Sequence, residues 1–366
     1  MPPLEAWEKV LIELSAFEDN AHGWWTCTEC HGGMDTDDKG GAHTGLISDP
    51  SADPEDTCSL CHPTQGNSQS NSLHANLKGY EVALQARSDH AAWAHLDEMQ
   101  SYHCDSCHTT CGQCHVSQPD SVGGGLLDAH SFDARASMTR TCTACHGSRV
   151  GNEYLGKNED LRGDVHFRQA RMVCTDCHTG ADLHGETNPD ATTRYDGPQI
   201  PACADCHPEA VSGNSDVPQH NLHQDRLSCQ VCHSLPYKSC DGCHTERDEE
   251  GRAFFETDGS YMTFLIGFNP LQSETRPYEY VPLRHVPIAE DSFAYYGDDL
   301  LSNFSALPTW AYATPHNIQL VTPQNSSCDN CHGNKDIFLT LDKIYPNEVE
   351  ANQALIVTDI PQSMVP

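Results

Sequence analysis

The chain has 366 residues, of which 37% are hydrophobic and 7% aromatic, and its formal net charge is -33. A chain this polar would struggle to build an ordinary hydrophobic core of its size. The negative charge argues against binding to nucleic acid or to anionic membranes, although it equally suits a protein kept soluble outside the cell. No apolar run approaches the roughly 18 residues of a membrane-spanning helix.

Regular structure is expected to be sparse. Residues 4–18 carry apolar side chains at helical spacing, and residues 79–100 should form the longest helix. Residues 252–256 and 261–266, on either side of Asp258-Gly259, are typical of a β-hairpin. They lie in the stretch 245–327, which contains 13 of the 27 aromatic residues and could form a core of its own. The tail, 333–366, has several prolines and should wrap the surface or dock on a neighbour.

One short motif, Cys-x-x-Cys-His, occurs ten times and uses all 20 cysteines. We number these motifs 1 to 10 along the chain. The cysteine pairs are Cys27 and Cys30, Cys58 and Cys61, Cys104 and Cys107, Cys111 and Cys114, Cys142 and Cys145, Cys174 and Cys177, Cys203 and Cys206, Cys229 and Cys232, Cys240 and Cys243, and Cys328 and Cys331. The histidines that follow them are His31, His62, His108, His115, His146, His178, His207, His233, His244 and His332.

This motif is the attachment signature of c-type haem. On a helical turn, residues i and i+3 share a face, so both thiols can reach one porphyrin edge while the next histidine binds the iron as proximal ligand. Cys-x-x-Cys alone would also fit a thioredoxin-like redox pair, half of a zinc site or a disulfide. With 23 histidines in the chain, ten chance matches have a probability of roughly 1 in 10^12, treating positions as independent.

The ten motifs resemble those of multihaem c-type cytochromes, and they span residues 27 to 332. The resemblance implies ten covalently attached haems c, a location outside the cytoplasm, and a mostly irregular fold with short α-helices, little β-structure and a haem core. We expect one continuous domain over 1–366, with motifs 1–9 in 27–244, the aromatic stretch in 245–327, and motif 10 and the tail in 328–366. Residues 1–20 lack the basic and apolar regions of a signal peptide, which suggests a mature chain after signal removal.

Thirteen histidines lie outside the motifs, and distal ligation of the ten irons is the best account of them. His220 and His223, three residues apart, suit two adjacent haems. His103 is the weakest candidate, and His22 and His95 are held in reserve; one distal ligand could also come from a neighbouring copy. The favoured distal ligands are His43, His74, His90, His130, His166, His184, His220, His223, His285 and His316.

If every iron carries two histidines, none has room for a substrate, and electron transfer by hopping along the haems remains. The expected protein is an electron carrier and not an enzyme. It would lie extracellularly or at the cell surface, with the periplasm as second choice. Its partners would be other copies of itself in a filament, or partner cytochromes and an extracellular electron acceptor. The alternative is an oxidoreductase of small sulfur or nitrogen compounds with one open iron, resembling octahaem tetrathionate reductase or hydroxylamine oxidoreductase.

Overall fold

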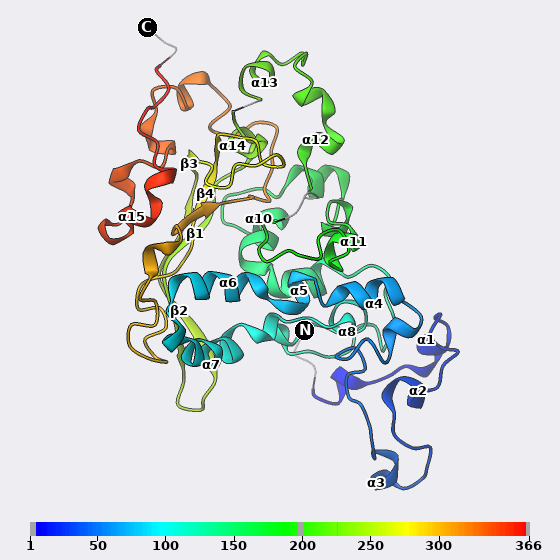
Figure 1. Cartoon of the computed structure of the whole chain (residues 1–366). Coiled ribbons are helices and arrows are strands. Elements are labelled where there is room, and N and C mark those ends of the chain that lie inside the picture. The colour runs from blue at the N-terminus through cyan, green and yellow to red at the C-terminus, as the bar shows by residue number, and fades with distance from the viewer. Residues whose placement is uncertain (1–4, 197–200, 225, 364–366) are drawn as a thin grey trace. The chain divides into compact units, whose positions relative to one another are not determined.

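The structure is a computed structural model that describes residues 5–196, 201–224 and 226–363. Helices account for 39% of it and strands for 13%, and the helices are short (Figure 1). The expectation of short helices with little β-structure is therefore confirmed, although the balance is mixed rather than mostly irregular. None of the described helices is long and apolar enough to cross a membrane.

The chain forms two compact units, each assembled from three separate segments. Unit 1 comprises Met1–Lys78, Cys104–Gly147 and Val173–Gly197, and unit 2 comprises Gly79–His103, Ser148–Met172 and Pro198–Pro366. The linear divisions expected from the sequence, 27–244, 245–327 and 328–366, do not coincide with either unit. Motifs 1 to 6 belong to unit 1 and motifs 7 to 10 to unit 2.

Unit 1 consists of short helices and turns joined by irregular segments. Its α-helices are α1 (Leu14–Glu18), α2 (Cys27–His31), α3 (Lys39–Ala42), α4 (Pro63–Gln69), α5 (Leu73–Asn76), α8 (Cys111–His115), α9 (Thr143–Cys145) and α11 (Gly180–Leu183). Local capping explains where some of them begin. Before α2, the Glu29 carboxylate accepts hydrogen bonds from the backbone N and the hydroxyl of Thr26, at 2.6 and 2.9 Å, which satisfies polar groups at the helix start.

Unit 2 contains every strand of the described residues. Its α-helices are α6 (Lys78–Arg87, which starts at the unit boundary), α7 (Trp93–His103), α10 (Asn152–Leu155), α12 (Cys203–Cys206), α13 (Pro218–His223), α14 (Cys229–His233) and α15 (Val349–Asn352). Strand β1 (Tyr237–Arg247) pairs antiparallel with β2 (Ala253–Thr263). A second, antiparallel sheet has the order β3 (Leu265–Phe268), β4 (Tyr280–His285), β5 (Trp310–Tyr312).

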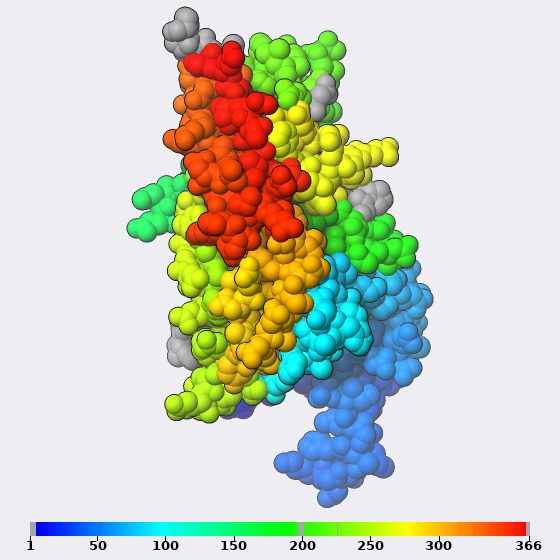
Figure 2. Space-filling view, turned by 60° about the vertical axis from the view of Figure 1, so that its left-hand side comes forward, coloured from blue at the N-terminus to red at the C-terminus, as the bar shows by residue number. Residues whose placement is uncertain are grey.

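The aromatic stretch contributes to a polypeptide core in unit 2. Val231, Ile266, Phe338 and Val357 form one buried cluster. Tyr237 of β1 is fully buried, and its hydroxyl lies 2.6 Å from the carbonyl oxygen of Leu283. In Figure 2 the orange and red C-terminal residues form a continuous part of the surface of this unit. This core holds β1 and β4 in place, and β1 carries motif 9.

Both long helices expected from the sequence are interrupted. In place of a helix over 4–18, the described residues form a 3-10 turn, Glu8–Val10, and α1, with Leu11 extended; Leu4 lies outside the described residues. The helix expected over 79–100 is divided into α6, a 3-10 turn (His90–Ala92) and α7. The break occurs at Asp89, whose carboxylate accepts from the backbone N of Ala91 at 2.8 Å and so starts a new helical segment.

The hairpin prediction was wrong in its pairing. Residues 253–263 form the single strand β2, so Asp258-Gly259 lies inside a strand opposite Asp241 rather than in a turn. The actual partner is β1, and the turn lies near Asp248, whose carboxylate accepts from the backbone N of Arg252 at 2.8 Å. Sequence alternation predicted strand conformation correctly but could not identify the pairing partner, which the turn decides.

Candidate functional site

Nine of the ten motifs lie at short helical turns. Motifs 1, 4 and 8 coincide with the whole of α2, α8 and α14, and motif 7 contains α12. Motif 5 spans the end of a π-turn (Met138–Cys142) and α9. Motifs 2, 3, 6 and 10 contain the 3-10 turns Cys58–Leu60, Asp105–Cys107, Cys174–Asp176 and Cys328–Asn330. A helical turn brings residues i and i+3 to one side, as attachment of both thiols to one porphyrin edge requires.

No disulfide joins any of the twenty cysteines, all of which lie within the described residues, and each has at least partial solvent exposure. The described residues contain no group of three or more His, Cys, Asp or Glu side chains placed to hold a metal ion. The cysteine pairs are therefore not arranged as disulfides or as complete zinc sites. A porphyrin differs from such sites because it supplies four nitrogen ligands itself and asks the protein for only one or two axial ligands.

The described residues pair seven motif histidines, each with one spare histidine, at nearly constant distance. Ring centroids are 6.0 to 6.4 Å apart in every pair. Unit 1 contains the pairs His31 with His130, His62 with His22, His115 with His184, and His146 with His74. Unit 2 contains the pairs His207 with His166, His233 with His220, and His332 with His223.

This spacing fits two imidazoles bound to opposite faces of one iron. A metal–nitrogen bond to histidine is about 2 Å long, and the ring centre lies roughly 1 Å beyond the nitrogen, so two trans ligands place their centroids about 6 Å apart. Direct stacking would bring the rings closer, as in the 4.0 Å separation of His22 and Phe132. The same separation recurs in seven pairs and matches the separation expected for a pair of axial ligands.

Hydrogen bonds at Nδ1 orient several of these rings. In four motif histidines Nδ1 lies within hydrogen-bonding distance of a backbone carbonyl oxygen, so Nδ1 is the donor and Nε2 is the nitrogen that could bind a metal. The acceptors are Ile47 for His31 at 2.8 Å, Asp133 for His115 at 2.6 Å, Gln319 for His233 at 3.0 Å and Gln362 for His332 at 3.1 Å. Among the spare histidines, His223 donates in the same way to Gln219 at 3.0 Å.

Burial lowers the pKa of five of the paired histidines and so favours the neutral form that binds metal; these are His22, His74, His130, His146 and His184. Burial lowers the pKa of His74 to about 4, with a further contribution from His146 and His178. Burial, followed by the influence of His62 and His130, lowers the pKa of His22. Burial, followed by the influence of His178, also lowers the pKa of His146.

The total accessible surface supports the same interpretation. The polypeptide exposes 20904 Å², whereas a folded monomer of 40.2 kDa exposes about 14,500 Å². Large apolar side chains near the motifs account for part of this surface, including Trp24 at 91%, Leu60 at 76% and Leu222 at 74% exposure. Flat apolar cofactors bound at the motifs would cover such surface, so the residues present at the seven paired motifs fit haem.

Six of the ten favoured distal ligands are in the seven pairs, and the seventh position is taken by the reserve histidine His22. Nothing in the sequence around His22 indicates this role.

His43 and His90 are exposed and lie outside the pairs. His43 follows the last residue of α3, and the ring of His90 lies 4.4 Å from that of Trp93. His316 also lies outside the seven pairs, and its backbone N donates to Glu153 at 2.9 Å. Motif histidines His108, His178 and His244 are not in these pairs either.

The geometry of His285 does not suit a distal ligand. The ring is 1% exposed, and both nitrogens are engaged. Its Nε2 lies 3.0 Å from the Glu348 carboxylate, and its Nδ1 lies 2.9 Å from the carbonyl oxygen of Cys240 and 2.9 Å from the Asp241 carboxylate. Burial lowers the pKa of His285, but hydrogen bonds to Glu348 and Cys240, with the charges of Glu348 and Asp241, raise it overall. His285 thus joins β4 to motif 9 as a structural cation.

Motif 9 differs from the others because it lies in strand β1. In the antiparallel register Cys240 is paired with Ser260, Cys243 with Thr257 and His244 with Glu256. Gly242, between the two cysteines, has a φ of +44°, which interrupts the regular alternation of side chains along the strand. The His244 Nε2 lies 4.0 Å from the Asp258 carboxylate. The expectation that every motif occupies a helical turn was therefore wrong at this one site.

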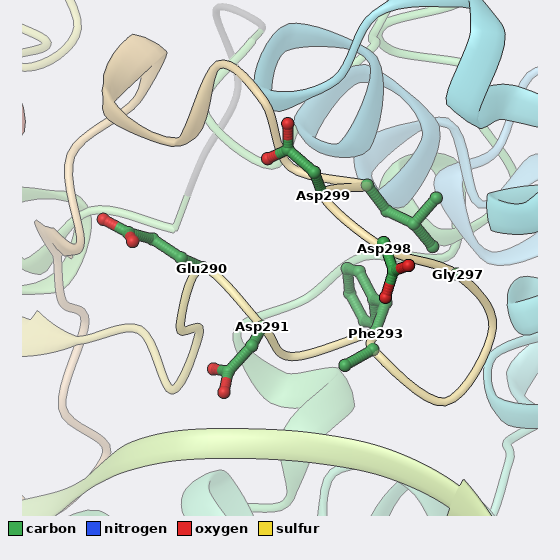
Figure 3. A pocket seen from close by; sticks show the side chains of 8 residues that line it. Glu290, Asp291, Phe293, Gly297, Asp298 and Asp299 are labelled. Carbon is green, nitrogen blue, oxygen red and sulfur yellow. The ribbon is translucent and has the colours of Figure 1, made fainter.

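An acidic pocket of about 290 Å³ lies in unit 2, lined by Glu290, Asp291, Phe293 and Asp298 among others. Its carboxylates point in different directions rather than toward one centre (Figure 3). This pocket therefore lacks the converging ligands of a cation site. No protein-family model, curated protein or solved structure matches the chain.

Proposed function

We propose that this protein binds ten haems c through its ten motifs and transfers electrons between them. The observation that carries this proposal is the set of seven histidine pairs at 6.0 to 6.4 Å, each joining one motif histidine to one spare histidine. Haem supplies the reversible change between ferric and ferrous iron. The chain binds the porphyrin through thioethers, fixes the axial rings and restricts the access of water.

Neighbouring motifs lie close enough for electrons to hop. In unit 2 the thiols of Cys203 and Cys229 are in hydrogen-bonding contact, which joins sites 7 and 8. Burial, followed by the influence of Cys232, raises the pKa of Cys331, so sites 8 and 10 also lie near each other. His220 and His223, on α13, face the motif histidines of sites 8 and 10. One helix thus supplies distal ligands to two adjacent sites, and these contacts support a continuous electron path.

Two axial histidines at each iron would leave no position for a substrate, so a carrier is favoured over an enzyme. We place this carrier outside the cytoplasmic membrane, at the cell surface or beyond. Thioether attachment of haem takes place outside the cytoplasm, and a net charge of -33 favours solubility there. A more specific form of the proposal is that copies of the protein assemble into a conductive filament. Electron microscopy of the purified holoprotein tests it, because only monodisperse particles would count against a filament.

One observation favours the alternative function, an oxidoreductase of small sulfur or nitrogen compounds. At site 9 the spare histidine next to the motif, His285, has both nitrogens engaged by other groups. The Nε2 of His244 is near the Asp258 carboxylate. Such a site could hold an iron with an open sixth position, which is the arrangement that substrate chemistry requires.

Two measurements on the holoprotein separate these possibilities. The intact mass gives the number of attached haems, for which ten is expected; a mass without haem would overturn the proposal. Carbon monoxide added to the fully reduced protein then reports open irons through the Soret band. No change is expected for an electron carrier, whereas a change equivalent to one haem in ten would favour the oxidoreductase.

A further inference from the structure

The order of the sites in space is not their order along the chain. Motif 4 lies directly against motif 2, although motif 3 separates them in sequence. The thiols of Cys58 and Cys111 are in hydrogen-bonding contact. The hydroxyl of Ser51, seven residues before Cys58, accepts from the backbone N of Gly112 at 2.8 Å and lies 2.7 Å from the hydroxyl of Thr110.

The approach of these two segments depends on a glycine. A Cβ atom on Gly112 would lie 2.6 Å from the Ser51 hydroxyl oxygen, far inside normal contact distance. Ser51 is itself buried and also bonded to Asp49 at 2.6 Å, so it cannot easily move away. The second position of motif 4 is therefore free of a side chain where the segment that precedes motif 2 comes close.

Motif 4 is also connected to the spare histidines of sites 1 and 2, through Phe132 and Asp133. His115 donates from Nδ1 to the carbonyl oxygen of Asp133 at 2.6 Å. The preceding residue, Phe132, stacks on His22 at 4.0 Å and lies 5.3 Å from His130. His22 and His130 are the spare histidines paired at sites 2 and 1. Site 4 is consequently joined to the beginning of the path by two independent contacts.

Motif 3 is joined instead to motif 5. The thiols of Cys107 and Cys145 are in hydrogen-bonding contact. The 3-10 turn of motif 3 (Asp105–Cys107) and α9 of motif 5 both pack on the 3-10 turn Asp120–Val122. In that turn the Ser121 hydroxyl lies 3.3 Å from the Cys145 sulfur. Motif 3 therefore adjoins motif 5, whereas the thiol contact of motif 2 is with motif 4.

We infer that sites 3 and 4 exchange places in space, so that electrons from sites 1 and 2 reach site 4 before site 3 or site 5. This inference rests on the proposed function, because it concerns the haems attached at these motifs. Site 5 is also in contact with site 6, through the thiols of Cys142 and Cys174. Site 4 is next to site 5, because α8 packs on the π-turn Met138–Cys142, whose last residue begins motif 5. Site 3 thus adjoins site 5 beside a line through sites 1, 2, 4, 5 and 6, and it can act as a side branch.

The iron positions of the holoprotein, from a crystal structure with anomalous scattering or from electron cryomicroscopy, test this order. The iron held by His115 should be nearer than the iron held by His108 to the iron held by His62. The reverse order would overturn the inference while leaving the proposed function intact. Absence of haem in the mass measurement would instead overturn the proposed function.

A kinetic experiment provides a second test. A ruthenium photosensitiser attached at Met34→Cys, close to site 1, would inject electrons from a sacrificial amine. His184→Met would make haem 4 a high-potential reporter with its own ferric charge-transfer band. In this background Gly112→Ala should slow reduction of the reporter severalfold, because it separates motifs 2 and 4. The control Gly147→Ala, whose Cβ would meet no atom within 4 Å, should not. An unchanged rate in Gly112→Ala would overturn the direct contact between sites 2 and 4.

Discussion

The ring of Phe132 lies stacked on the imidazole of His22, with centroids 4.0 Å apart and planes at 21°. The same phenyl ring lies 5.3 Å from His130, and Phe17 packs against both Phe132 and His130. One aromatic cluster in unit 1 therefore touches the spare histidines of two sites. Because a distal ring can rotate about its bond to iron, this cluster would determine ring orientation at sites 1 and 2.

We predict that Phe132→Leu alters the ligand geometry of two haems without releasing them. The planes of His22 and His62 now meet at 38°, and loss of the stacked ring should change this angle. Low-temperature electron paramagnetic resonance of the ferric protein measures it, because the largest g value depends on the angle between the imidazole planes. Stability should fall by about 1 kcal/mol. Phe268→Leu, which removes a ring stacked on Tyr280, is the control and should leave the spectrum unchanged.

His22→Ala should open one iron. His22 is the histidine paired with His62 in this fold, so its loss would expose the distal face of haem 2. After reduction, carbon monoxide should bind to one haem more than in the unmodified protein. His95→Ala, at an exposed position, should have no such effect. If both variants bind equal amounts of carbon monoxide, His22 is not a distal ligand.

His285→Gln should destabilise unit 2 by about 3 kcal/mol, because it leaves the buried Glu348 carboxylate without its charged partner. The haem count and the binding of carbon monoxide should stay unchanged, since His285 serves here as a structural cation. Denaturant unfolding of both proteins measures the stability loss. His90→Gln, on the surface, should cost almost nothing. A newly opened iron in His285→Gln would show that His285 is a ligand after all.

The contribution of His285 should also depend on pH in a defined direction. Its pKa is raised in the folded protein above the usual value of 6.5. The stabilisation is then fully present below about 6.5, the unfolded value, and is lost as the pH rises through the folded pKa. The stability difference between the unmodified protein and His285→Gln should therefore shrink in alkaline solution. A difference that grows with pH would contradict a protonated His285.

Removal of residues 361–366 should change one haem. The carbonyl oxygen of Gln362 accepts from the His332 Nδ1 at 3.1 Å, and that of Pro361 accepts from the Gly333 backbone N at 2.6 Å. Loss of the hydrogen bond at Nδ1 makes the imidazole a weaker donor to iron, so the reduction potential of haem 10 should rise. Spectroelectrochemical titration detects this shift. Removal of residues 364–366 alone keeps both carbonyl groups and should leave all potentials in place.

Sequence patterns could predict the features that depend only on neighbouring residues, but not the pairings between distant segments. The strand character of residues 253–263 could be predicted, but their pairing with 237–247 could not, because the partner contains motif 9 and resembles a helical turn in sequence. The sequence favours His285 as a distal ligand, whereas the structure buries it against Glu348 and Cys240. His22 was only a reserve candidate for a distal ligand, because nothing near it in the sequence indicates that Phe132 and His62 lie beside it in space.

The sequence by itself determined the kind and number of attachment motifs and their adjacent histidines, because two thiols and an imidazole within five residues act as one local unit. Only the tertiary structure decided which spare histidine faces which motif, and which motifs are neighbours. The ring of His31 lies close to that of His130. The thiol of Cys58 contacts that of Cys111, although motif 3 lies between these two cysteines in the sequence. Such contacts join segments far apart in the chain, and they depend on how loops close and pack rather than on the residues beside each histidine.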